Sequence, residues 1–226
     1  MEYKGLIAGL GNPGPKYERT RHNMGFLLVD HVVALAAGRK SMDLKVLDES
    51  GDYRLWSVRL SGARLLLAQP QTYMNLSGRA VGRICGRHGL SADGVVVVHD
   101  ELDLVLGRMK MKRGGGNNGH NGLESIQEVL GTPDFHRLRI GIGRPQFSSQ
   151  VTDWVLGEFG PEEWALVREV VPAAWKGLDL FFRRGPALGV QFLSRFAPAP
   201  AADSEESARP QSPTRAKSGP VESEPK

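Results

Sequence analysis

The chain has 226 residues, 40% of them hydrophobic, which suffices for one buried core and does not require a second domain. Its formal net charge is +4, so a polyanionic partner such as nucleic acid is compatible with the composition. The single cysteine, Cys85, excludes an internal disulfide, and no run of 18 apolar residues predicts a membrane span. Because the first residues lack a secretory pattern, we expect a cytoplasmic protein.

Hydrophobic periodicity predicts strands that alternate with helices along the chain. The expected strands are residues 3–10, 52–60, 63–69, 95–99, 106–113 and 136–142. The expected helices are residues 24–37, 76–88, a helix ending near Gly131, residues 162–183 interrupted or bent at Pro172, and residues 186–195. This alternation predicts an α/β fold: a single three-layer domain with a twisted mixed, partly parallel sheet and helices on both faces.

The composition changes after Phe196. Residues 197–226 are rich in Pro, Ala, Ser and Glu, and they contain no aromatic residue. Such a segment cannot bury enough apolar surface to fold alone. We therefore expect a folded domain over residues 1–196 and a disordered tail over residues 197–226.

The first strand runs into the turn Gly11-Asn12-Pro13-Gly14. Gly9, Gly11 and Gly14 match the spacing of a dinucleotide-binding turn, but the next helix pattern begins about ten residues later than such a turn requires. The alternative is a tight strand-end turn that lets the backbone approach a ligand. Asn12 then lies at the mouth of a strand-to-helix crossover, where open α/β sheets bind ligands.

His22 follows this turn and is the candidate general base. A loop histidine is often only a surface residue, but Asp100 is expected to emerge at the carboxyl end of the buried strand 95–99. A carboxylate at that place can hold one imidazole nitrogen and leave the other free to take a proton from water. Since His99, Asp100, Glu101 and Asp103 alternate in direction along an extended segment, they are a poor metal-ligand set.

Two further loops carry polar groups suited to a substrate. The loop GGGNNGHNG, residues 114–122, is either a flexible connection or an anion-binding loop before a helix. Basic residues alternate along the flanking strands, which favours phosphate contacts: Arg108, Lys110, Lys112, Arg137 and Arg139. In the loop PQTYMN, residues 70–75, Asn75 either caps a helix or binds a substrate amide, and Tyr73, like Tyr17, could stack on a base.

Five motifs in order resemble the bacterial-type peptidyl-tRNA hydrolases. They are GLGNPGPKYERTRHNMG, QPQTYMNLSG, VVHDELDL, GGGNNGHNGL and FHRLRIGIGRP, and the resemblance covers residues 3–195. It implies an enzyme of translation that hydrolyses the ester of peptidyl-tRNA or N-blocked aminoacyl-tRNA without metal or cofactor. By default, we expect a monomer. The alternative is an inactive RNA-binding module, such as a processing factor, on the same fold.

The resemblance also implies roles for individual residues. His22 would activate water, Asp100 would support it, and Asn12 would help to distinguish blocked from unblocked substrates. The remaining site residues are implied to bind the peptide or the tRNA: Tyr17, Tyr73, Asn75, Asn121, Lys112 and Arg139. One departure is the loop, where Asn117 and Asn118 replace the usual His and Gly. We expect a positive φ at Asn118.

Overall fold

The computed structural model describes residues 2–49, 51–60 and 62–198. Seven strands form one sheet in the order β2-β3-β4-β1-β5-β7-β6. β1 is parallel to both β4 and β5, and β5 is parallel to β7, while β2, β3 and β6 pair antiparallel with their neighbours. The strands are β1 Gly5–Gly9, β2 Lys45–Asp48, β3 Tyr53–Leu60, β4 Ala63–Pro70, β5 Val95–Glu101, β6 Met109–Arg113 and β7 His136–Gly141.

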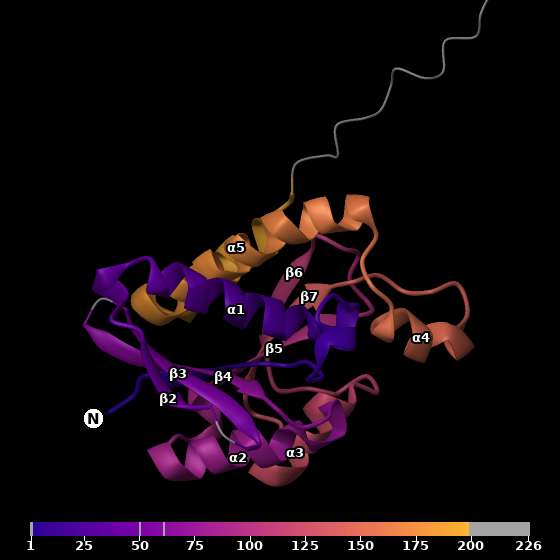
Figure 1. The fold of residues 1–226 in the computed structure, drawn as a ribbon. Coiled ribbons are helices and arrows are strands. Elements are labelled where there is room, and N and C mark those ends of the chain that lie inside the picture. The colour runs from indigo at the N-terminus through magenta and orange to yellow at the C-terminus, as the bar shows by residue number, and fades with distance from the viewer. Residues whose placement is uncertain (1, 50, 61, 199–226) are drawn as a thin grey trace, which may run out of the picture.

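Helices cover both faces of the sheet (Figure 1). α1 Met24–Ala37, α5 Pro161–Arg184 and α6 Pro186–Arg195 lie on one face, and α2 Ser77–His88 and α3 Asn121–Leu130 lie on the other. The valines of β5 alternate between the two apolar cores, so this strand is buried on both sides. The expected three-layer α/β fold with a mixed, partly parallel sheet is therefore confirmed.

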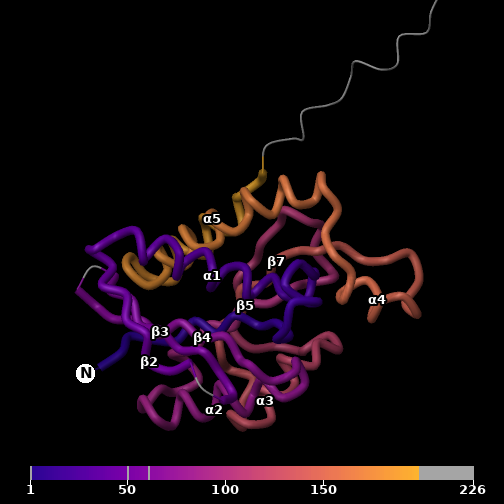
Figure 2. The backbone as a smooth tube through the Cα atoms, in the orientation of Figure 1, coloured from indigo at the N-terminus to yellow at the C-terminus, as the bar shows by residue number. Residues whose placement is uncertain are grey.

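A sixth α-helix, α4 Val151–Leu156, lies at one end of the molecule, beside rather than within the two helical layers (Figure 2). Short 3-10 turns connect several elements. They are η1 Pro15–Tyr17, η2 Arg21–Asn23, η3 Lys40–Met42, η4 Met74–Leu76, η5 Ala92–Gly94 and η6 Ser148–Gln150.

Two glycines bring β1 and α1 into direct backbone contact. A Cβ atom on Gly9 would lie 2.2 Å from the Gly25 carbonyl oxygen, and one on Gly25 would lie 2.2 Å from the Leu10 nitrogen. The Leu10 N–H instead donates to the Val98 carbonyl at 2.9 Å. Gly9 therefore serves helix–strand packing. Because α1 begins only at Met24, well after the turn, its N-terminus does not meet the turn as a dinucleotide site requires.

The structure agrees with most predicted elements and corrects three. α1 and α6 begin and end where the sequence predicts. α5 runs unbroken through Pro172, so of the two expectations there, an interruption or a bend, the interruption is wrong; neighbouring turns of the helix are held by packing on the core. β2 and α4 were not predicted, because each has at most six residues and neither contributes a fully buried side chain.

No helix in the described ranges is long and apolar enough to cross a bilayer. Of the predicted tail, residues 199–226 lie outside the described residues.

Candidate active site

His22 and Asp100 meet at the carboxyl end of the sheet. His22 lies in η2, just before α1, and Asp100 lies near the end of β5. Their side chains are joined by a hydrogen bond of 2.9 Å between Nδ1 and a carboxylate oxygen. Since a carboxylate accepts, Nδ1 carries the proton and the lone pair of Nε2 is available. The predicted pairing of a loop histidine with a strand-end carboxylate is present, 78 residues apart in the chain.

The environment adjusts the protonation of both groups. Burial alone would lower the pKa of His22, but the charge of Asp100 and its hydrogen bond raise the pKa above the usual 6.5. Burial alone would raise the pKa of the Asp100 carboxyl, but His22 and His120 hold that pKa below its usual range. Asp100 is thus an anion that stabilises the imidazolium formed when His22 accepts a proton.

His120 is a third member of this cluster that the sequence motifs did not single out. Its Nε2 donates to the same Asp100 oxygen at 3.1 Å, and its Nδ1 accepts the backbone N–H groups of Gly122 and Leu123 at 3.1 and 3.4 Å. His120 is therefore the N-cap of α3. Its position directly before a predicted helix was the available signal, but histidine is an uncommon cap.

Three hydrogen bonds hold Asn12 in place. Its side-chain oxygen accepts the Met74 N–H at 2.9 Å, and Asn23 bonds both the N–H and the carbonyl of Asn12, at 2.8 and 3.0 Å. Asn12 lines the cleft, and because its oxygen is used internally, its amide nitrogen is the group left for a ligand. Asn23 occupies the N-cap position of α1, but its side chain makes no cap bond and is used to hold Asn12.

The cluster opens into a cleft of about 640 Å³. Tyr73, Asn75 and Asn121 line it, together with His22, Asp100 and Asn12. Leu76 rather than Asn75 occupies the N-cap position of α2, which leaves the Asn75 amide free of that role. Tyr17 is not among the lining residues; its ring lies under the Lys16 ammonium at 4.7 Å.

One wall of the cleft is the unpredicted helix α4, and the opposite rim is the glycine-rich loop. Val151, Val155 and Leu156 of α4 give this wall an apolar character. Asn118 in the loop has φ of 50°, which confirms the expected left-handed conformation.

Side-chain hydrogen bonds hold both asparagines of the loop. Asn118 donates to Asp103 at 3.3 Å, and Asn117 donates to Gln127 of α3 at 2.9 Å. The two asparagines that replace the usual His and Gly therefore tie the loop to its surroundings on both sides.

The basic side chains of β6 and β7 differ in exposure and in their partners, although they alternate regularly in the sequence. Arg139 donates to Glu101 at 2.7 Å and is half-buried. Lys112 is partly exposed, and burial, with the nearby Arg139 and Arg137, lowers its pKa. Arg137 is fully buried over the Phe135 ring and donates to the Gly116 carbonyl at 2.8 Å. The interpretation of Arg137 as part of an exposed phosphate face is therefore wrong, and it supports the loop instead.

His99, Glu101 and Asp103, which the sequence places close together as possible metal ligands, each bond to a different group. Burial, together with the nearby His120, lowers the pKa of His99 to about 3, and its Nδ1 donates to the Asp100 carbonyl. Glu101 pairs with Arg139, and Asp103 pairs with Arg144.

Among the described residues, His22, Asp100 and His120 place ligand atoms within 4.8 Å of one another. This set is a poor fit to a cation. His120 accepts two N–H groups at Nδ1, so its proton is on Nε2, the atom that would have to coordinate the metal.

The fold and the site define a three-layer α/β protein with a buried histidine–aspartate pair at the base of an amide-lined cleft, the arrangement of a general-base hydrolase. The peptidyl-tRNA hydrolase family model matches residues 6–199. The peptidyl-tRNA hydrolase of Maridesulfovibrio salexigens is 56% identical over 198 residues, covering 88% of this chain and 97% of its own. The chain belongs to the peptidyl-tRNA hydrolase family.

A second curated relative and a solved structure agree with this assignment. A peptidyl-tRNA hydrolase of Nitratidesulfovibrio vulgaris is 48% identical over 201 residues, covering 88% of this chain and all of its own. The crystal structure of peptidyl-tRNA hydrolase from Acinetobacter baumannii superposes with a TM-score of 0.80 at 31% identity, over 88% of this chain and 100% of that one.

Proposed function

We propose that this protein hydrolyses the ester that joins a peptide, or an N-blocked amino acid, to the 3′-terminal ribose of tRNA. Family membership supports the reaction. The observation that carries the mechanism is the hydrogen bond from His22 Nδ1 to Asp100, which leaves the Nε2 lone pair available at the base of the cleft. Release of tRNA and free peptide places the activity in translation.

The proposed reaction needs one base and no covalent intermediate. His22 Nε2 takes a proton from a water molecule as the water oxygen attacks the ester carbonyl. The resulting tetrahedral intermediate loses the ribose oxygen, which receives the proton from the His22 imidazolium. Asp100 stabilises that imidazolium throughout, and a nearby amide N–H can donate to the developing oxyanion.

Amides in the cleft account for the choice of substrate. Asn12, Asn75 and Asn121 offer hydrogen bonds to the carbonyl and N–H groups of a blocked amino acid. Among the described residues, the carboxylates that line the cleft are Asp100 and Glu101, which already pair with His22 and Arg139, so a free α-ammonium would lack a counter-charge there. Blocked substrates are therefore favoured over unblocked aminoacyl-tRNA.

The tRNA body is proposed to lie over β6 and β7. Lys112 and Arg139 would contact phosphates there, and Tyr73, which is 60% exposed at the rim, would stack on a terminal base. Tyr17, outside the cleft lining, is a candidate for tRNA rather than peptide contacts. We also propose that the protein acts as a monomer in the cytoplasm, a location that a tRNA substrate supports.

The test is hydrolysis of N-acetyl-aminoacyl-tRNA beside the same tRNA with a free amino group. We expect rapid cleavage of the blocked form alone, with the rate unchanged by a chelator selective for transition metals. Binding of tRNA without cleavage of either form would instead support the RNA-binding module, and restoring His and Gly at Asn117 and Asn118 would then be the first change to make. The intact His22–Asp100 pair and the family match disfavour that alternative.

A further inference from the structure

A buried arginine next to the proposed base joins two parts of the cleft that lie far apart in the sequence. Arg21 directly precedes His22 in η2 and is 7% exposed. Its Nη1 donates to the Glu158 carbonyl at 2.9 Å, and its Nη2 donates to the Glu163 carboxylate at 2.7 Å. Its backbone N–H donates to the Gly157 carbonyl at 3.0 Å. One residue therefore ties η2 to the segment that connects α4 to α5.

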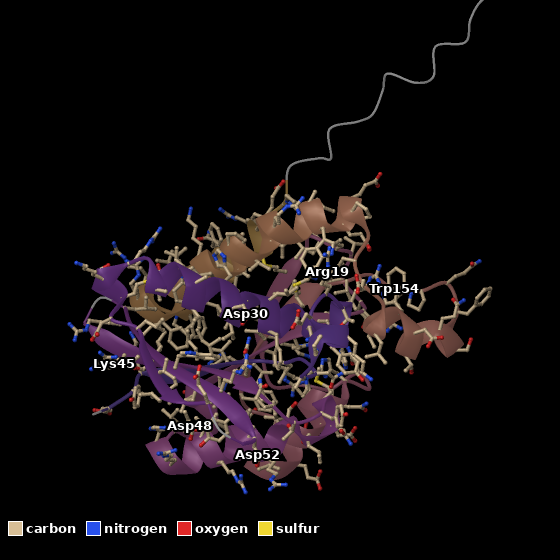
Figure 3. All side chains as sticks on the ribbon, in the orientation of Figure 1. Arg19, Asp30, Lys45, Asp48, Asp52 and Trp154 are labelled. Atoms are coloured by element: carbon tan, nitrogen blue, oxygen red, sulfur yellow. The ribbon has the colours of Figure 1, made fainter. Side chains whose placement is uncertain are left out.

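The guanidinium also packs on two aromatic rings, one from α4 and one from the segment that follows it. Its central carbon lies 4.0 Å from the centre of the Trp154 ring and 5.3 Å from that of Phe159. Trp154, seen on α4 in Figure 3, donates its indole N–H to the Gly143 carbonyl at 3.0 Å. The planar, permanently charged guanidinium suits contacts with two aromatic rings, and a lysine ammonium would not reproduce these contacts.

The helix held in this way is the apolar wall of the cleft. α4 has only six residues, too few to be stable without packing, and it lies beside the helical layers. Trp154 points to Arg21, while Val151, Val155 and Leu156 of the same helix line the cleft. The position of the wall relative to His22 therefore depends on the contacts of Arg21.

We propose that Arg21 is a positioning residue that fixes α4 beside the turn that carries His22 and so sets the fit of the aminoacyl or peptidyl group in the cleft. This inference rests on the proposed function. Arg21 does not line the cleft, and its two Nη groups bind protein acceptors, so it has no direct part in the chemistry. An apolar wall binds the ground state and the transition state alike, so its displacement raises KM and leaves kcat unchanged.

The test compares Arg21→Lys and Trp154→Leu with the parent. Arg21→Lys keeps a cation near Glu163 but removes the stack on Trp154. We expect KM for N-acetyl-aminoacyl-tRNA to rise about tenfold in each variant, the size of effect that a buried cation–π contact supplies. kcat, its pH profile and the inhibition constant of uncharged tRNA should not change. The effects of the two changes should be less than additive in the double variant, because both remove the contact between Arg21 and Trp154.

Arg19→Gln is the matched control. Arg19 lies on the same loop, its guanidinium is 5.0 Å from the Trp164 ring, and its side chain is 62% exposed. This variant should keep the KM of the parent. A fall in kcat at constant KM, or an equal loss of affinity for uncharged tRNA, would overturn the role of Arg21. An active parent with an unchanged KM in Arg21→Lys would refute it too, whereas an inactive parent would refute the proposed function itself.

Discussion

At the scale of the residue, the site depends on one shared carboxylate oxygen. Asp100 accepts from His22 and from His120 on the same oxygen, and the centroids of the two imidazole rings lie 5.1 Å apart. His22 belongs to η2, just before α1, and His120 caps α3. A single buried anion therefore orients the proposed base and anchors the loop that borders the cleft.

This arrangement predicts the pH dependence of the reaction. The base must be neutral, and the pKa of His22 is raised by Asp100, so kcat/KM should rise with pH through a value above 6.5. In Asp100→Asn the raising interactions are lost while burial remains, so the acid limb should move to lower pH. The plateau should also fall, since the imidazolium is no longer stabilised. Rate profiles across pH 5 to 9 check this; an acid limb that did not move would exclude the pairing as the cause.

The same residue-scale geometry shows what the sequence could and could not give. His22, Asp100 and Asn12 were recognisable because they follow predicted strands and turns, whose ends meet at one edge of a parallel sheet. The N-cap interaction of His120 with α3 could not be recognised from the sequence, because it depends on the orientation of the imidazole ring. The family resemblance implied that Tyr17 lines the site, but η1 carries it out of the cleft lining.

At the scale of the element, the paired basic strands predict how tRNA binding responds to salt. Lys112→Ala should raise KM and make its log–log salt dependence shallower by about one unit, as expected for one lost phosphate contact. The exposed Lys45 on the opposite edge strand, β2, provides a control that should not change either value. Equal salt slopes in Lys112→Ala and the parent would contradict a phosphate contact.

Arg139 requires a different variant, because it neutralises Glu101, which is only 6% exposed. Removing Arg139 alone would leave a buried carboxylate unpaired and would confuse instability with lost binding. The contribution of Arg139 should therefore be measured by comparing the double variant Arg139→Ala/Glu101→Gln with the single variant Glu101→Gln.

The close contact of β1 and α1 yields a second prediction at this scale. Gly25→Ala would place a methyl group 2.2 Å from the Leu10 nitrogen and 2.4 Å from the Val98 carbonyl oxygen. Separating the elements should cost about 1–3 kcal/mol of unfolding free energy. kcat should fall as well, since α1 begins directly after His22 and β5 carries Asp100.

Gly86→Ala is the control for this prediction, because a Cβ atom there meets nothing within 4 Å. It should stabilise α2 slightly, by about 0.4–1 kcal/mol. Chemical denaturation and turnover of both variants provide the check. A fully stable, fully active Gly25→Ala would show that the backbone contact is not needed.

Sequence patterns predicted elements well where a segment is strongly apolar. The valine run of β5, buried on both sides, and the apolar run of α1 located both elements closely. β2 and α4 escaped prediction because they are stabilised by neighbours: β2 by pairing with β3, and α4 by Arg21. The apolar wall of the cleft was therefore the part of the site that the sequence could not supply.

At the scale of the whole molecule, we propose that residues 1–196 form the complete catalytic domain and that residues 197–226 are dispensable for it. The family match ends at residue 199, and Phe196 packs against the core just after α6. A chain cut after Pro198 should keep the kcat, KM and Tm of the full chain. A lower Tm or a raised KM in the shortened chain would show that the tail contributes to folding or to tRNA binding.

The central claim is that His22 is the base of a hydrolase that acts on peptidyl-tRNA. The most direct test is single-turnover cleavage of N-acetyl-aminoacyl-tRNA by the parent and by His22→Ala, with tRNA binding measured on the same preparations. We predict a rate loss of about 10²- to 10⁴-fold with tRNA affinity and Tm nearly unchanged. Cleavage by His22→Ala at close to the parent rate would contradict the account and move the search for the base elsewhere in the cleft.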